Sequence, residues 1–215
     1  MPDYKINKTD KLLSENIRNR KEEMQLMFSR NLETHEQLLD LLFNGTNHAN
    51  YNGFKDTKLI WNIAAFTITI SYDLKVIGQD LMLAENEWQK RLHARHACLI
   101  IYESINDFFD LLGKEFKTLV AIKICNEEIE EELNKVRSEL NSYKRKYFNK
   151  LKEIRNTSIA HRDNDSLKQI NTIINLSWSD TIELVTNFDI ILTDLGKIIQ
   201  VIIYAGLDDF NELKN

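Results

Sequence analysis

Apolar residues recur three and four positions apart over most of the chain, which is the spacing that lines one face of an α-helix. The clearest case follows Asn126, where five glutamates at positions 127–132 suit the positive end of a helix dipole. Further apolar positions then alternate steps of four and three, as in a coiled coil: Ile129, Leu133, Val136, Leu140, Tyr143, Tyr147, Leu151 and Ile154. The pattern predicts a long helix that continues to about His161.

The same spacing predicts the other helices. We expect them at about Asp10–Phe43, Asp56–Leu83, Asn86–Leu112 and Glu115–Cys125, with a last helix that begins behind Ser177 or Ser179 and ends at Gly206. Asn44-Gly45 is a typical helix end, so residues 44–53 are expected to form a loop. Residues 162–166 are also expected to be a loop, and the pattern leaves 167–175 undecided.

One segment, residues 66–72, has a competing strand pattern because it alternates with period two and is rich in β-branched residues. Helix is favoured there, since the 3.6-residue period extends on both sides. Six glycines and one proline in 215 residues are few, which also favours long helices. The predicted fold is an all-α, up-and-down bundle of five to six helices, formed as a single domain over 1–215.

The composition indicates the class of protein and the cellular compartment to expect. Hydrophobic residues make up 43% and charged residues 28%, which is typical of a globular chain. Residues 1–9 are polar, so no signal peptide is expected, and the longest apolar stretch, 59–77, is interrupted by Asn62, Asp73 and Lys75. Cys98 and Cys125 fall in apolar helical patterns and are expected to be reduced core thiols. We therefore expect a cytoplasmic protein with no membrane contact.

The net charge is −5, yet residues 137–162 contain eight basic and two acidic residues. Tyr143, Tyr147 and Phe148 lie among these bases. A patch of this kind can hold a phosphate backbone. The alternative is a solvated helix face whose aromatic residues lie in the core.

The end of this basic segment resembles the signature of the HEPN superfamily, in which an Arg, commonly followed by a polar residue, precedes a His by four to six positions. Here Arg155-Asn156 precedes His161, and the surrounding text runs from Leu151 to Asp163. The following segment, 176–180, is similar to the abortive-infection type of HEPN protein. The resemblance covers about 140–195, and the motif-bearing part of the domain is about 126–205.

The resemblance implies a metal-independent endoribonuclease without a cofactor, in a toxin–antitoxin or anti-phage setting. His161 would act as general base or acid, Arg155 would stabilise the charge that grows on the phosphate, and Asn156 would orient the substrate or the histidine. Basic neighbours would bind RNA: Lys146, Lys150, Lys152 and Arg162. The implied partners are RNA, a second copy of the chain, and an antitoxin such as a small nucleotidyltransferase.

The spacing of the motif is awkward for a site on one face of a single helix. On an ideal helix Arg155 and His161 lie about 120° apart, so they share a face only if the helix loosens near Ala160. The HEPN resemblance implies a two-fold dimer in which both copies of the motif face one cleft. The alternative is a non-catalytic interaction or nucleotide-binding module, with Arg155 paired to Glu153 or Asp163 and His161 capping the helix.

Two histidines of the third predicted helix have a spacing that can serve a metal site. His93 and His96 are three residues apart, and with Glu103 and Asp107 they resemble ligands in metal-binding bundles. The repeated Glu-x-x-His pattern is missing, so we expect no metal. These residues are expected to be partly exposed beside Arg91 and Arg95, which could add to a basic groove.

Overall fold

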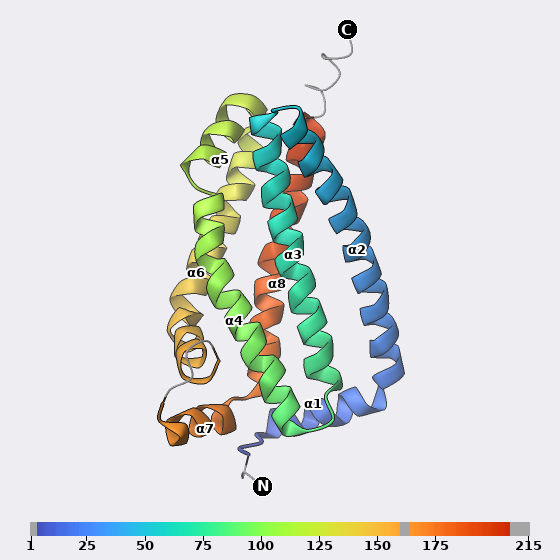
Figure 1. The fold of residues 1–215 in the computed structure, drawn as a ribbon, viewed down its shortest axis with the longest axis vertical. Coiled ribbons are helices and arrows are strands. Elements are labelled where there is room, and N and C mark those ends of the chain that lie inside the picture. The colour runs from blue at the N-terminus through green and yellow to red at the C-terminus, as the bar shows by residue number, and fades with distance from the viewer. Residues whose placement is uncertain (1–3, 160–163, 207–215) are drawn as a thin grey trace.

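Five long helices run up and down in the computed structural model, which describes residues 4–159 and 164–206 (Figure 1). They are α2 (Lys21–Tyr51), α3 (Lys55–Leu83), α4 (Glu87–Leu111), α6 (Glu127–Ser158) and α8 (Trp178–Gly206). Short helices occupy the two ends of the bundle: α1 (Lys8–Asn19) and α7 (Ser166–Asn175) at one, and α5 (Lys114–Leu119) with a π-helical turn, Val120–Ile124, at the other.

Helix α3 lies at the centre of the packing, between α2, α4 and α8, while α6 packs against α4, α7 and α8. The buried side chains form one cluster whose most enclosed members come from all the long helices except α2: Ile63, Leu74, Leu81, Ile101, Ile105, Phe108, Leu140, Leu151, Phe188 and Ile202. Helix α2 contributes less to this cluster because it packs chiefly on α3, at the edge of the bundle (Figure 1).

The all-α prediction is confirmed, since the described residues contain eight α-helices and no strand. The segment 66–72, with its strand-like alternation, lies in the middle of α3, where the helical period on both sides continues through it. The undecided segment 167–175 is the helix α7, which is capped by the Asp165 side chain. Helix α8 begins at Trp178, and Ser177 accepts a hydrogen bond from the Asp180 N–H, as its position before the helix predicts.

The predicted first helix, 10–43, is wrong in its continuity. It is divided at Arg20, whose φ of −120° and ψ of 23° are not helical. The Arg20 N–H donates to the carbonyls of Asn16 and Ile17, which closes α1. The expected apolar stripe has a gap between Ile17 and Met24, so the chain at the break has no side chain to bury and can turn there.

The expected end of that helix at Asn44-Gly45 is also wrong, because α2 continues to Tyr51. Gly45 lies inside the helix, where a Cβ atom would overlap the indole ring of Trp61 on α3. The glycine therefore allows two helices to approach closely. The true end has Gly53 at a φ of +70°, with Gly53 and Phe54 donating to the carbonyls of Asn50 and Ala49 in a Schellman arrangement.

Replacing Gly45 with alanine is expected to lower the free energy of unfolding by about 1–2 kcal/mol, because the overlap with Trp61 outweighs the better helix propensity of alanine. Urea unfolding followed by circular dichroism measures the change. Gly78→Ala is the matched control: Gly78 is also in a helix, but a Cβ atom there meets nothing within 4 Å. The control should be stabilised by about 0.5–1 kcal/mol. Equal changes in the two variants would contradict the close approach.

The two cysteines differ. Both are free, and Cys98 is buried as predicted, where burial raises the pKa of its thiol to about 12. The expectation of a core position is wrong for Cys125, which is exposed. It ends the π-helical turn with a φ of 48°, and its thiol donates to carbonyls of that turn. A residue that ends a helix with a left-handed backbone conformation no longer follows the helical period. Its side chain therefore need not point to the buried face, which explains why Cys125 is exposed.

By length and composition alone, α3 could cross a membrane. In the bundle it is contacted by α2, α4 and α8, and Lys75 forms an ion pair at 2.8 Å with Asp189 of α8. The buried apolar residues of α3 therefore pack at the centre of the helical bundle: Ile60, Ile63, Ala64, Leu74 and Leu81.

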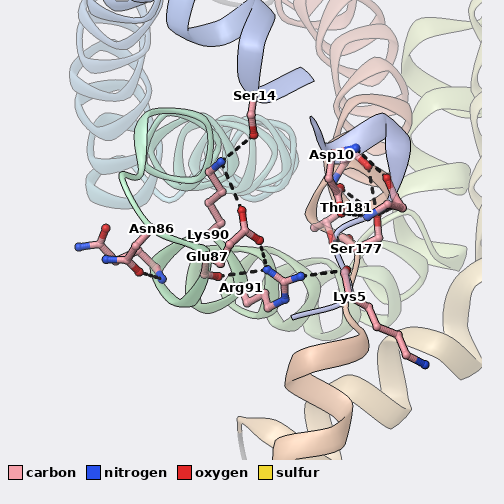
Figure 2. Close-up of polar contacts among 12 residues, drawn as sticks. Lys5, Asp10, Ser14, Asn86, Glu87, Lys90, Arg91, Ser177 and Thr181 are labelled. Carbon is pink, nitrogen blue, oxygen red and sulfur yellow. Dashed lines mark hydrogen bonds and ion pairs between the residues drawn. The ribbon is translucent and has the colours of Figure 1, made fainter. Parts of the chain in front are cut away.

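A buried polar network ties the base of the bundle together (Figure 2). Arg91, on α4, is fully buried; it pairs with Glu87 one turn earlier and donates to the Lys5 carbonyl at 3.2 Å. Asp10, on α1, is also fully buried and accepts hydrogen bonds from Ser177 and from the Ser179 N–H at the start of α8. These contacts join residues 5–10 to the beginnings of α4 and α8.

Candidate functional site

The helix that carries the motif ends earlier than predicted. Helix α6 closes at Ser158, and Ile159 leaves it with a φ of −137° and a ψ of −65°. The ideal-helix angle between Arg155 and His161 therefore does not apply, because the chain departs from the helix between them. His161 and Arg162 lie outside the described residues.

Arg155 is held by α4. Its Nε donates to the Glu103 carboxylate at 2.7 Å, and its guanidinium carbon lies 5.2 Å from the centre of the Tyr102 ring. Its Nη1 donates to the side-chain oxygen of Asn156 at 3.0 Å. The carboxylate partner is thus Glu103 and not Glu153. The Arg155 side chain is 24% exposed, so part of the guanidinium reaches solvent.

Helix α4 also holds the C-terminal end of α6. Arg95 donates from Nη1 to the Ser158 carbonyl at 2.8 Å and from Nε to the Arg91 carbonyl at 3.1 Å. A guanidinium at this position satisfies one of the free carbonyls of the helix end and opposes its negative dipole. Arg91 and Arg95 are buried, so the expectation that they add to a basic groove is wrong. Arg91 contacts the Lys5 carbonyl near the start of the chain, and Arg95 contacts the end of α6.

The lysines expected to bind RNA do not share one face of α6. With about 100° per residue, Lys146 and Lys150 point towards α8, whereas Lys152 and Asn156 point outward. Lys150 lies 3.8 Å from the Asp180 carboxylate of α8, and all four of these side chains are exposed.

Another basic residue of α6, Lys144, points towards α4. Lys144 donates to the Asn106 side chain at 2.9 Å and lies over the ring of Phe148, which stacks on Tyr102 at 4.8 Å. Tyr143 is buried, and its hydroxyl donates to the Leu184 carbonyl. The aromatic residues among the bases thus belong mainly to helix contacts.

An open cavity of about 600 Å³ lies on the α7 side of α6. Its charged lining contains more carboxylates than ammonium groups: Glu153, Asp165 and Asp180 against Lys150 and Lys168. Asn171, Thr172 and Asn175 add amide and hydroxyl groups from α7. This balance does not favour a phosphate in the cavity.

The candidate metal ligands do not converge. Within the described residues, no three His, Cys, Asp or Glu side chains form a metal-type group. His93 faces Asp80 at 4.0 Å. Glu103 is occupied by Arg155. Burial, with smaller effects of the charges of Arg95 and His93, lowers the pKa of His96.

Sequence reasoning missed the residues that surround Arg155. Glu103 is 52 positions away in sequence, and Arg95 is 63 positions from the carbonyl it binds. The period of α4 places Glu103 on an exposed face, but it gives no sign of which helix lies beside it. Only the packing of α4 against α6 reveals these contacts.

A family model matches the C-terminal part of the chain. The model of the AbiU2 family of HEPN domains matches residues 117–214, a segment that contains α6, α7, α8 and the Arg155–His161 motif. No curated protein and no solved structure matches the chain. The family match agrees with the all-helical bundle, and it places residues 117–214 in the HEPN superfamily, within a family associated with abortive infection.

Proposed function

We propose that the protein is a metal-independent endoribonuclease that acts in an abortive-infection or toxin–antitoxin setting in the cytoplasm. Its substrate is RNA, and its catalytic residues are Arg155 and His161, assisted by Asn156. The family match supports the defence role in general terms. The cleavage chemistry is our inference from the motif and from the surroundings of Arg155.

The observation that carries the proposal is the presentation of Arg155. Its guanidinium is braced by Glu103 and Asn156, at 2.7 and 3.0 Å, yet its side chain keeps solvent access at the end of α6. A planar fork held in one orientation suits the oxygens of a phosphate, and it stabilises the charge that develops there during reaction.

In the proposed reaction the RNA 2′-hydroxyl attacks the adjacent phosphorus, and the bond from phosphorus to the 5′-oxygen breaks. One histidine removes the 2′-hydroxyl proton, and another gives a proton to the departing 5′-oxygen, which leaves a 2′,3′-cyclic phosphate and a 5′-hydroxyl. Imidazole suits both transfers because its ordinary pKa is near neutrality. Each chain has one motif, so the two transfers favour a homodimer in which each copy supplies a His161.

Other parts of the proposal concern binding. Lys146, Lys150, Lys152 and Arg162 are assigned to the RNA backbone, and we take residues 1–215 as one domain. Because the lysines point in different directions around α6, the RNA would bend around the helix end and not lie along one face. An antitoxin, such as a small nucleotidyltransferase, would hold the activity in check.

RNA cleavage by the purified protein in EDTA tests the proposal. We expect the wild type to cut, and Arg155→Ala and His161→Ala each to lose activity by a factor of about a hundred or more. The variants should keep the circular dichroism and the sedimentation of the wild type. Lys197→Ala serves as the control, because Lys197 is exposed on α8 and pairs only locally with Asp194 in the described structure. A wild type that is silent on several RNAs would overturn the proposal.

A non-catalytic interaction or nucleotide-binding module is the second candidate. The ion pair between Arg155 and Glu103 favours it, because a paired arginine can serve only to join α4 to α6. On this alternative the variants at 155 and 161 cut no less than the wild type, or no protein cuts at all.

A further inference from the structure

The surroundings of Arg155 carry an inference that rests on the proposed function and deepens it. Three groups restrain the guanidinium: the Glu103 carboxylate, the Tyr102 ring and the Asn156 side chain. Two of these come from α4 and lie next to each other in sequence. We propose that Glu103 is a positioning residue, which selects the edge that Arg155 presents to the scissile phosphate.

The argument begins with the hydrogen-bond donors of the guanidinium. Arginine has five N–H donors, and it can grip a phosphate either through Nε and one Nη or through both Nη atoms. In the structure Nε is taken by Glu103 and one Nη1 hydrogen by Asn156. The edge formed by Nη1 and Nη2 keeps its remaining hydrogens for a ligand. Glu103 therefore blocks the side-on grip and leaves the end-on grip.

A row of side chains along the contact between α4 and α6 reinforces this orientation. Arg155 lies over Tyr102, Tyr102 stacks on Phe148, and Lys144 lies 5.2 Å from the centre of the Phe148 ring. These aromatic rings are in contact with each other and with cations, so they are poor platforms for stacking RNA bases. Their effect is to hold the plane of the guanidinium.

The carboxylate has a cost for binding. It neutralises part of the charge that would attract RNA, so it does not serve affinity. A fixed orientation of the guanidinium favours the chemical step, because a misplacement of about 1 Å can lower its rate by about a hundredfold. We therefore expect loss of Glu103 to lower kcat and to leave KM unchanged or reduced. A residue needed only for stability would not separate the two constants.

Steady-state cleavage of a short fluorescent RNA in EDTA tests the inference with three variants of the full chain. Glu103→Ala should lower kcat about tenfold or more without raising KM. Glu103→Gln keeps an oxygen that accepts from Nε and should recover most of kcat. Asp107→Ala, one turn along the same helix and also exposed, should behave as the wild type. Circular dichroism and thermal unfolding check that all variants fold, which is expected because Glu103 is 51% exposed.

The outcomes separate this inference from the proposed function. If the wild type cuts and Glu103→Ala has an unchanged kcat, the positioning role is overturned while the nuclease stands. If Glu103→Ala and Asp107→Ala lose equal activity, the effect is one of surface charge, and the role is again overturned. If the wild type cuts no RNA, the proposed function fails and the inference fails with it. A low kcat in Glu103→Ala that is restored in Glu103→Gln supports the assignment.

Discussion

Replacement of Glu87 with alanine is expected to lower the free energy of unfolding by about 3–5 kcal/mol. Glu87 is the carboxylate that pairs with Arg91, whose side chain is fully buried (Figure 2). The other hydrogen bonds of that guanidinium go to carbonyls, and its Nε has no partner. Without the carboxylate, a buried charge would stay in the base of the bundle with only these carbonyls and the Tyr4 ring to compensate it. Urea unfolding at constant pH measures the change.

A matched control separates burial from helix-dipole effects. Glu128→Ala also removes a glutamate from the first turn of a long helix, but Glu128 is exposed, so the expected cost is about 0.3–1 kcal/mol. Glu87→Leu combined with Arg91→Met removes both charges and should recover most of the loss. If Glu87→Ala costs no more than Glu128→Ala, the charge of Arg91 is balanced in another way.

Phe108→Ala is expected to be equally damaging, with a loss of about 3–5 kcal/mol. The Phe108 side chain is 1% exposed and comes from α4. Its ring meets Phe66 of α3 at 5.0 Å and Phe188 of α8 at 6.2 Å, both edge to face. Truncation would leave a cavity where three helices meet, because their backbones cannot close over it. Thermal and urea unfolding should both report the loss.

Phe43→Ala is the control for this substitution. Phe43 is 65% exposed on α2, so the same change of side chain there should alter stability by no more than about 0.5 kcal/mol. Phe108→Leu should fall between the two, since it retains most of the buried volume. Similar losses at positions 43 and 108 would mean that Phe108 is not part of a tightly packed core.

The helices themselves could be predicted because their apolar spacing is regular and glycine and proline are scarce. The failures have local causes. Gly45 has the sequence features of a helix end, but its lack of a side chain serves the contact with Trp61, which depends on a helix that the sequence does not position. The break at Arg20 has no proline or glycine to mark it; its only trace is a missing apolar residue in the stripe.

The candidate site could be predicted only in part, since the motif is a local feature and its support is not. Arg155 and Asn156 are adjacent in sequence, and so are easily found. Glu103 and Arg95 reach the motif from α4, across more than fifty residues. A periodic pattern shows which residues leave the core, but not which neighbour they meet. Tertiary packing decides that question.

The extent of the family match has a consequence for how this fold can be divided. The matched segment begins at residue 117, after α4 has ended, yet α4 supplies Glu103 to the motif and Phe108 to the core. A fragment cut at that boundary would expose the faces of α6 and α8 that α4 covers. We therefore expect the recognisable segment to be smaller than the unit that can fold. A chimaeric protein that carries the motif would therefore need to include α4.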